Sequence, residues 1–276
     1  MHTPPAPEPP APESSAPEGV DVTTPHSARV WNYWLGGEDN YPVDRELGDQ
    51  ILGIHPGIAV DARAGRAFLV RAVTHLAREE GVRQFLDVGT GLPTHRNIHE
   101  IAQSVAPDAR IVHVDNDPLV LAHARVLLRG TEEGATAFVD HDLRDTGRVL
   151  ARAGELLDLD QPVGLSVIGT LGHLPTLEEA AGVVRSYLAG LPSGSFLVVA
   201  DAVLPDEGSA AEALDEWNRE AALAYRGHTP AEFASYFDGL ELLDPGVGPT
   251  PLWRPEPGEV GRTPDTDMYG AVARKP

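Results

Sequence analysis

The 276-residue sequence contains no cysteine. This absence excludes disulfide frameworks, thiolate nucleophiles, and zinc or iron–sulfur sites built on cysteine. No stretch approaches the roughly 20 apolar residues that a membrane-spanning helix needs. The first residues, MHTPPAPEPPAPESSAPEG, also lack the basic and apolar regions of a secretory signal. We therefore expect a soluble, cytoplasmic protein.

Basic residues are scarce as well. Lys and Arg number 21 against 42 Asp and Glu, which gives a formal net charge of −21. A nucleic acid or an anionic lipid surface is repelled by such a protein. The composition thus argues against nucleic acid and membranes as partners, and it leaves a small molecule or another protein, with a small molecule favoured.

Composition divides the chain into two parts. Residues 1–24 are mostly Pro, Ala, Glu and Ser, with too few apolar side chains to offset the entropy cost of ordering, which predicts a disordered tail. Residues 25–276 have the length of one large domain. Within this domain, we expect residues 25–80 to form an N-terminal helical cap.

Short apolar runs alternate with helical patterns after residue 80. Five of these runs predict strands: QFLDVGTG, ARIVHVDND, ATAFVDHDLRD, PVGLSVIGTLGHLP and SGSFLVVADAV. Such alternation predicts a doubly wound α/β fold, in which helices cover both faces of a mainly parallel sheet. Two final strands are expected at residues 240–243 and 269–275.

The segment FLDVGTGLPT closes the first of these strands with Asp87, Gly89 and Gly91. Glycines at a strand-to-helix turn let bare backbone approach a bound group, and ligands of open α/β sheets lie beyond the carboxyl ends of the strands. A dinucleotide-binding GxGxxG motif would have glycine in place of Thr94, and Asp87 would set negative charge beside a phosphate. A cofactor with an ammonium group, such as S-adenosylmethionine, suits Asp87 better.

The next two strands also end in acids. In HVDNDP, Asp115 lies roughly two dozen residues past the glycines. A carboxylate at this position can accept hydrogen bonds from both hydroxyls of the cofactor's ribose. Asn116, the next residue, is also a candidate for binding the cofactor. Asp117 is predicted to cap the following helix. In VDHDLRD, Asp142 and the backbone N–H of Leu143 are placed to bind an adenine edge. Alternatively, these acids do not bind the cofactor: Asp115 is then an ordinary acid at the end of a strand, and Asp142 is a loop acid exposed to water.

The segments FLDVGTGLPT, HVDNDP and DHDLRD together resemble the class I S-adenosylmethionine-dependent methyltransferases. SARVWNYWLGGEDNYPVDRE, RAFLVRAV and YGAVARKP are further similar to one bacterial methyltransferase-like subfamily, once catalogued as a domain of unknown function. The resemblance covers about residues 25–276. It implies a Rossmann-like, seven-stranded sheet whose last strand is antiparallel, S-adenosylmethionine as the cofactor, and cofactor residues at Asp87, Gly89, Gly91, Asp115 and Asp142. The sequence departs from the superfamily at Pro93, where a third glycine is common.

The segment ARVWNYWLGGEDNY places aromatic and polar side chains ahead of the sheet. Related methyltransferases often cover the site with an N-terminal helical element. This makes Arg29 and Tyr33 candidates for contacting the methionyl end of the cofactor. Alternatively, Trp31 and Trp34 pack on the domain, and both interpretations can hold together.

Histidines supply the remaining candidates. Methyl transfer from a sulfonium mainly requires alignment, and a base is needed only if the acceptor must lose a proton. His173 in IGTLGHLP is the candidate for acceptor chemistry, and a loop-packing histidine is the alternative. His95 and His99 lie four residues apart, as a metal-binding pair could. No third ligand is close in sequence, so we expect no metal.

The sequence therefore predicts an S-adenosylmethionine-dependent methyltransferase with a small-molecule acceptor. Two alternatives stay open. One is a protein that binds S-adenosylmethionine or S-adenosylhomocysteine without transferring a methyl group. The other, less favoured, is an NAD-dependent oxidoreductase, which would bind NAD and ignore S-adenosylhomocysteine.

Overall fold

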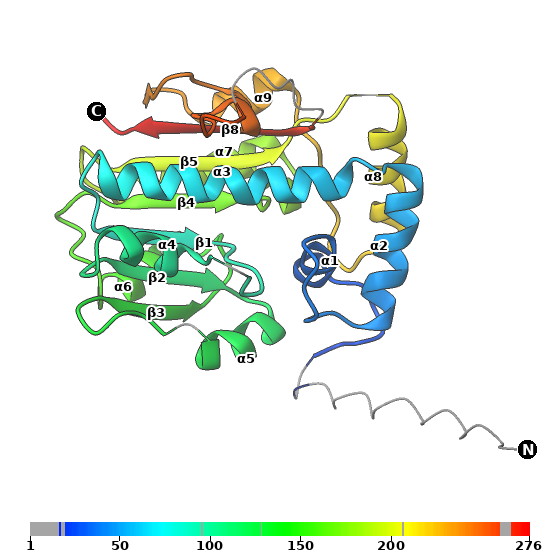
Figure 1. Cartoon of the computed structure of the whole chain (residues 1–276), viewed down its shortest axis with the longest axis horizontal. Helices are drawn as coiled ribbons and strands as arrows, with labels where there is room; N and C mark the ends of the chain where they lie inside the picture. The colour runs from blue at the N-terminus through cyan, green and yellow to red at the C-terminus, as the bar shows by residue number, and fades with distance from the viewer. Residues whose placement is uncertain (1–16, 18–19, 95, 128, 206, 260–265) are drawn as a thin grey trace, which may run out of the picture.

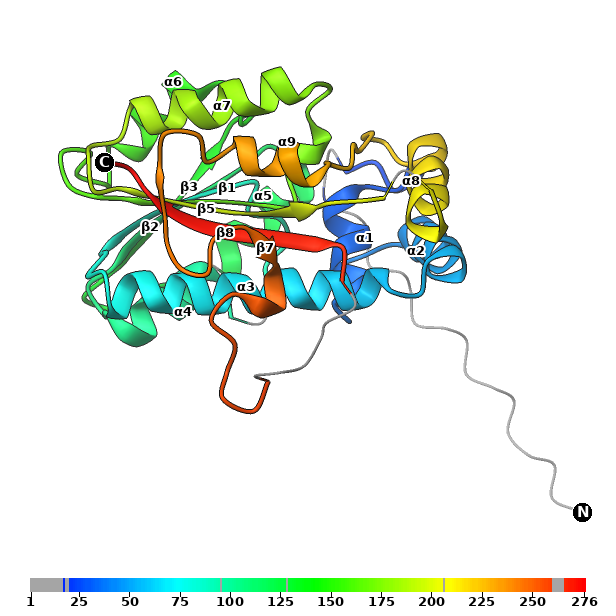
Figure 2. The ribbon, with the colours of Figure 1, turned by 90° about the horizontal axis from the view of Figure 1, so that it is seen from above.

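The computed structural model describes residue 17 and residues 20–94, 96–127, 129–205, 207–259 and 266–276. The tail predicted for residues 1–24 lies largely outside this part of the chain. The described residues form a central sheet with helices on both faces, and further helices stand beyond the carboxyl ends of the parallel strands (Figures 1 and 2).

Within the described residues the sheet has eight strands, seven of which follow the order β3-β2-β1-β4-β5-β8-β6, while the eighth, β7, pairs with β8. Their bounds are β1 Gln84–Val88, β2 Arg110–Asp115, β3 Ala135–Asp140, β4 Gly164–Ile168, β5 Phe196–Ala202, β6 Glu241–Leu242, β7 Gly248–Pro249 and β8 Met268–Arg274. The first five strands are parallel, and β8 is antiparallel to β5. The predicted doubly wound fold is confirmed, with the two-residue strand β7 as an addition.

The strand order reverses at β1. The chain builds β2 and β3 on one side of β1 and then returns to place β4 on the other side. Connections that leave in opposite directions open a crevice at the carboxyl ends of the two strands, which is where ligands of such sheets bind. The Asp87 turn, at the end of β1, lies at this crevice.

Apolar helix faces cover both sides of the sheet. One layer contains α3 Ile58–Arg78 and α4 Ile98–Val105, and the other contains α6 Thr146–Ala153, α7 Leu177–Ala189 and α9 Pro230–Ser235. Helix α5, Pro118–Leu127, lies beside β3. The α9 helix begins as its sequence predicts, because Thr229 and Glu232 each accept the other's backbone N–H and Pro230 fills the first turn.

The helical cap differs from the prediction. Helix α3 was expected within it, but Phe68, Val73 and Leu76 pack against the sheet beside Phe85 and Val198. At 21 residues, α3 is about 30 Å long and runs from the cap along the sheet. The cap consists of α1 Ser27–Trp34, α2 Pro42–Ile54 and, from the far half of the chain, α8 Ser209–Glu220.

Aromatic packing holds the cap together. The rings of Trp34 in α1 and Trp217 in α8 have centroids 6.0 Å apart, and both belong to one cluster with Ile51 of α2. Such ring pairs add about 0.5–1.5 kcal/mol beyond the area they bury. None of the helices that the structure describes is both long and apolar enough to cross a membrane.

Candidate functional site

The turn after β1 requires glycine for two different reasons. Gly89 and Gly91 have φ angles of +71° and +66°, a region that side chains with a Cβ disfavour. At Gly89, a Cβ would also lie 2.4 Å from Oγ1 of Thr170, whereas at Gly91 it would meet no protein atom within 4 Å. The backbone N–H groups of Gly89 and Thr90 donate to the carbonyl of Val114, which ties the turn to β2.

Asp87 is buried directly below this turn. Its carboxylate accepts hydrogen bonds from the hydroxyls of Ser166 and Thr90 and from Nδ1 of His113, 3.1 Å away. Burial favours the protonated form, but the hydrogen bonds, that from His113 foremost, outweigh it and hold the pKa of Asp87 below its ordinary value. The carboxylate is therefore ionised and fixed by the protein, and it fixes Thr90 in turn.

Asp115 joins the end of β2 to the same turn. Its Oδ2 accepts the N–H of Gly91 at 2.9 Å, and its Oδ1 accepts the N–H groups of Asn116 and Asp117. Burial is the strongest influence on this group and raises the pKa of Asp115, although these N–H groups favour the ionised form. Asp117 caps α5 through Leu119, as predicted.

Asp142 and Leu143 follow β3. Both carboxylate oxygens of Asp142 accept from the Arg144 guanidinium, at 2.9 and 2.6 Å, and this pairing lowers the pKa of Asp142. The carbonyl of Leu143 accepts the hydroxyl of Tyr187. Asp142 is half-buried, so its ion pair with Arg144 stands at the cavity rather than in the core.

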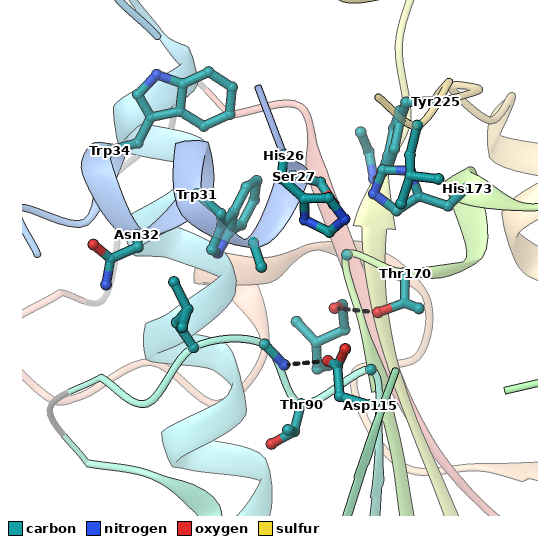
Figure 3. Close-up of a pocket in the computed structure, with 18 of the residues that line it drawn as sticks. His26, Ser27, Trp31, Asn32, Trp34, Thr90, Asp115, Thr170, His173 and Tyr225 are labelled. Carbon is teal, nitrogen blue, oxygen red and sulfur yellow. Dashed lines mark hydrogen bonds between the residues drawn. The ribbon is translucent and has the colours of Figure 1, made fainter. Parts of the chain in front are cut away.

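One cavity of about 410 Å³ joins these groups (Figure 3). In the close-up, Thr90 and Asp115 lie opposite Trp31 of the cap, with His173 and Tyr225 to one side. The structure brings eight of the predicted site residues to this cavity: Asp87, Gly89, Gly91, Asp115, Asn116, Asp142, Leu143 and His173.

Arg29 and Tyr33 are not among the described residues that line the cavity. The Arg29 guanidinium is buried within the N-terminal segment, where it donates to Asp44 and to the carbonyls of Asp21 and Thr24. A buried guanidinium must satisfy its donors locally, and here Asp44 of α2 and the backbone just before α1 do so. The hydroxyl of Tyr33 donates to Asp49, and this bond raises the pKa of Tyr33. We leave both residues out of the cofactor site.

Comparison with known proteins identifies the family. Residues 13–276 match the model of the S-adenosyl methyltransferase family. The chain belongs to this family. The predicted cofactor class is thereby confirmed: the protein is an S-adenosylmethionine-dependent methyltransferase, and the nicotinamide alternative is set aside.

Solved structures agree with this assignment. A DUF574 family protein from Streptomyces avermitilis is 42% identical, with a TM-score of 0.88 over 93% of this chain and 99% of that one. A proposed methyltransferase from Thermobifida fusca is 35% identical, with a TM-score of 0.84 over 95% and 99%. The plantazolicin methyltransferase BpumL shares the fold at 12% identity, with a TM-score of 0.50 over 90% and 94%. No curated protein matches the chain.

Arg66 of this methyltransferase lines the cavity and was missed from the sequence. It stands on the buried stripe of α3, between Ala62 and Leu69, and a basic residue at such a position is the signal that could have found it. Its guanidinium donates to the carbonyl of Arg96 at 2.5 Å. Burial lowers the pKa of Arg66, and the nearby negative charge of Asp87 opposes that effect.

His173 ends a short 3₁₀ turn after β4 of the methyltransferase, Leu171–His173. Its Nδ1 lies 2.9 Å from the carbonyl of Ala224, and because a carbonyl can only accept, Nδ1 carries the proton and Nε2 of the neutral ring keeps its lone pair. The ring packs edge-on against Tyr225, and burial lowers the pKa of His173. The imidazole is therefore neutral at neutral pH.

The other predicted histidines behave differently. His99 is buried, with its ring edge-on to His113 at 5.4 Å, and burial lowers the pKa of His99 to about 4. His99 thus packs against His113, which in turn bonds Asp87 below the glycine turn. His95 lies outside the described residues. The geometry of the His95–His99 pair, which was considered as a metal site, is therefore not described.

Proposed function

We propose that this methyltransferase transfers the methyl group of S-adenosylmethionine to a small molecule enclosed between the sheet and the cap. The observation that supports this proposal is the shared cavity, whose lining comes from the strand ends on one side and from α1, α2 and α8 on the other. Sites of small ligands and cofactors occupy about 300–1,000 Å³ and are concave and mostly apolar. A macromolecular acceptor would need an open surface instead.

We assign the cofactor's nucleoside to the ends of β2 and β3. Asp115 presents an oriented carboxylate beside Gly91, and carboxylates at this position suit a ribose diol. Asp142, Leu143 and Asn116 follow it along the same edge of the sheet, where an adenine edge would meet a side-chain acceptor and a backbone N–H. The open space beside Gly91 leaves room for the ligand at the turn.

The methionyl end carries a carboxylate and an ammonium group, and the cavity offers a partner for each. Arg66 supplies a guanidinium, whose planar donors match a carboxylate. Asp87 supplies fixed negative charge at the turn, while its own hydrogen bonds are made to the protein. We therefore assign Asp87 mainly to positioning the turn, which is a narrower role than the sequence indicated.

Once bound, the cofactor supplies an electrophilic methyl group, and the protein supplies alignment and exclusion of water. The cap residues around Trp31 and Trp34 close the cavity opposite Thr90 and Asp115. Where an acceptor must lose a proton, we assign Nε2 of His173 to accept it, since the Nδ1 proton of this ring is held by the carbonyl of Ala224.

The experiment uses S-adenosylmethionine labelled in its methyl group. The protein is incubated with it and with either the small-metabolite fraction or the macromolecular fraction of a bacterial extract. We expect label to appear in new compounds of the small-metabolite fraction. Label that appears only in protein or nucleic acid would contradict the proposed acceptor class, and no transfer in either fraction would favour a protein that binds the cofactor without using it.

A further inference from the structure

Asp201 is a fully buried carboxylate near the end of β5, and it is not among the described residues that line the cavity. Burying a carboxylate costs free energy unless hydrogen bonds stabilise the charge, so the groups that bond it indicate its role. Its Oδ1 accepts the hydroxyl of Tyr225 and the backbone N–H of Ala202. Its Oδ2 accepts the backbone N–H of Gly172 at 3.2 Å. Tyr225 and Gly172 belong to two separate segments that meet at His173.

These two segments are packed closely together. Gly172 precedes His173 in the short turn after β4, and Tyr225 lies in the loop after α8. The backbone N–H of Arg226 in that loop donates to the carbonyl of Gly172 at 2.8 Å. A Cβ at Gly172 would lie 2.4 Å from the ring of Tyr225, so this close approach requires glycine. The contacts thus surround the hydrogen bond from Nδ1 of His173 to the carbonyl of Ala224.

The loop is also held from the side of α8. The Asn218 side chain accepts the backbone N–H of Tyr225 at 2.7 Å and donates to the carbonyl of Tyr225 at 2.9 Å. Tyr225 is therefore fixed at its backbone by Asn218 and at its hydroxyl by Asp201. Since Ala224 is the residue just before Tyr225, these bonds also fix the carbonyl that accepts the Nδ1 proton of His173.

The rings of His173 and Tyr225 meet edge to face at the cavity, with their centroids 5.0 Å apart (Figure 3). Burial and the charge of Asp201 raise the pKa of Tyr225, so its neutral hydroxyl is the donor to the carboxylate. A neutral imidazole carries its proton on one nitrogen or the other, and only a proton on Nδ1 leaves a lone pair on Nε2. The position of the Ala224 carbonyl therefore decides whether His173 can accept a proton at Nε2.

We propose that Asp201 and Tyr225 are positioning residues that hold His173 in the tautomer with a proton on Nδ1 and a lone pair on Nε2. This inference rests on the proposed function, because it takes Nε2 of His173 as the group that accepts a proton from the methyl acceptor. On taking that proton the imidazole gains a positive charge, which the carboxylate of Asp201 favours. Neither positioning residue needs to touch the acceptor for this role.

The test observes the protonation of His173 directly, by NMR spectroscopy at neutral pH of protein whose histidine rings carry nitrogen-15. The signals of His173 are those that disappear in His173→Gln. In the wild-type protein, we expect the proton on Nδ1. Tyr225→Phe keeps the ring and removes the hydroxyl that donates to Asp201. We expect this change to lower the ratio of Nδ1-protonated to Nε2-protonated His173 about 2- to 10-fold, the range that the loss of one hydrogen bond supports.

Tyr236→Phe is the matched control, because it removes another buried tyrosine hydroxyl, one that bonds Nε2 of His228 at 2.8 Å. It should also lower the free energy of unfolding, but it should leave the tautomer of His173 unchanged. Asn218→Ala is a second test variant. Its side chain is exposed, so the core stays intact, and the loss of its bonds to Tyr225 should lower the same ratio about 2-fold.

An unchanged ratio in Tyr225→Phe or, if that variant does not fold, in Asn218→Ala would overturn the proposal. An equal fall in Tyr236→Phe would also overturn it, because any loosening of the core would then have the same effect. A wild-type His173 protonated on Nε2 would overturn both the proposal and the assignment of this ring to accept a proton. The acceptor class fails separately, in the experiment with the labelled methyl group, since the tautomer is measured without an acceptor.

Discussion

The two walls of the cavity are built in opposite ways. The sheet wall takes polar groups from consecutive strand ends between residues 87 and 143. The cap wall takes mainly apolar side chains from α1 and α2, near the N-terminus, and from α8, in the second half of the chain. The residues of the sheet wall therefore belong to short sequence motifs, whereas the residues of the cap wall come together only in the folded chain. This difference allows a fixed cofactor site to be combined with a variable acceptor site.

The largest expected effect concerns the glycine turn. Gly89→Ala adds a Cβ that meets Thr170 in a backbone region already unfavourable for alanine. We expect it to lower the free energy of unfolding by about 2–5 kcal/mol, from backbone strain and overpacking together. Gly91→Ala has a similar φ and no such contact, so it should cost about 1–2 kcal/mol. Urea unfolding of both variants checks this, and equal losses would show that contact with Thr170 is unimportant.

The second prediction concerns the nucleoside side of the sheet wall. Asp115→Asn removes the charge beside Gly91 and should weaken S-adenosylhomocysteine about 10- to 100-fold, as expected when hydrogen bonds to a charged group are lost. Calorimetric titration measures the change. Asp108→Asn, an exposed position away from the cavity, is the control. Unaltered affinity in Asp115→Asn would remove Asp115 from the site.

The third prediction separates the two ends of the cofactor. Arg66→Gln should lower the affinity for S-adenosylhomocysteine about 10-fold, since the charge-assisted hydrogen bonds between Arg66 and the ligand's carboxylate are lost. Methylthioadenosine lacks that carboxylate, so its affinity should not change. Arg63→Gln, one turn away and exposed, should affect neither ligand. If the affinities for both ligands fall equally in Arg66→Gln, Arg66 stabilises the fold and does not bind the methionyl end of the cofactor.

The smallest effect is a dependence of stability on pH. The pKa of His99 is about 4 in the folded protein and ordinarily 6.5, so the unfolded chain binds more protons between these values. This residue therefore makes the protein less stable as pH falls from 6.5 towards 4. His99→Phe keeps a ring against His113 and should reduce the loss of stability between pH 7 and pH 5. Urea unfolding at the two pH values measures it, and an unchanged difference would contradict the assignment.

Much of the sheet wall could be predicted from the sequence. Parallel strands end at the same edge, so acids and glycines that close successive strands must meet there, as Asp87, Asp115 and Asp142 do. Their burial could not be predicted, and burial decides the role of Asp87. A carboxylate surrounded by Ser166, Thr90 and His113 is already bonded, which its sequence motif does not reveal.

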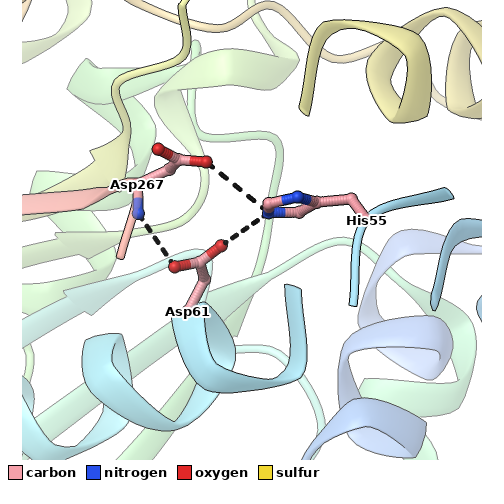
Figure 4. Close-up of side chains that lie close together, drawn as sticks. All are labelled: His55, Asp61 and Asp267. Carbon is pink, nitrogen blue, oxygen red and sulfur yellow. Dashed lines mark hydrogen bonds and ion pairs between the residues drawn. The ribbon is translucent and has the colours of Figure 1, made fainter. Parts of the chain in front are cut away.

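The cap wall could not be predicted in the same way. Helical periodicity indicates which face of a helix is apolar but not which partner covers it. Arg29 was a candidate for the methionyl end of the cofactor because related methyltransferases cover the site with an N-terminal element, and its sequence pattern did not reveal its partner Asp44. Likewise, Asp61 and Asp267 are 206 residues apart in sequence, and the backbone N–H of Asp267 donates to the carboxylate of Asp61 (Figure 4). Only the fold brings them together.

The most direct test of the account is a calorimetric titration of the wild-type protein with S-adenosylhomocysteine and, in parallel, with NAD. The account predicts one micromolar site for S-adenosylhomocysteine and no heat from NAD. Binding of NAD without binding of S-adenosylhomocysteine would contradict it, because the glycine turn with Asp87, Asp115 and Arg66 would then serve a different cofactor.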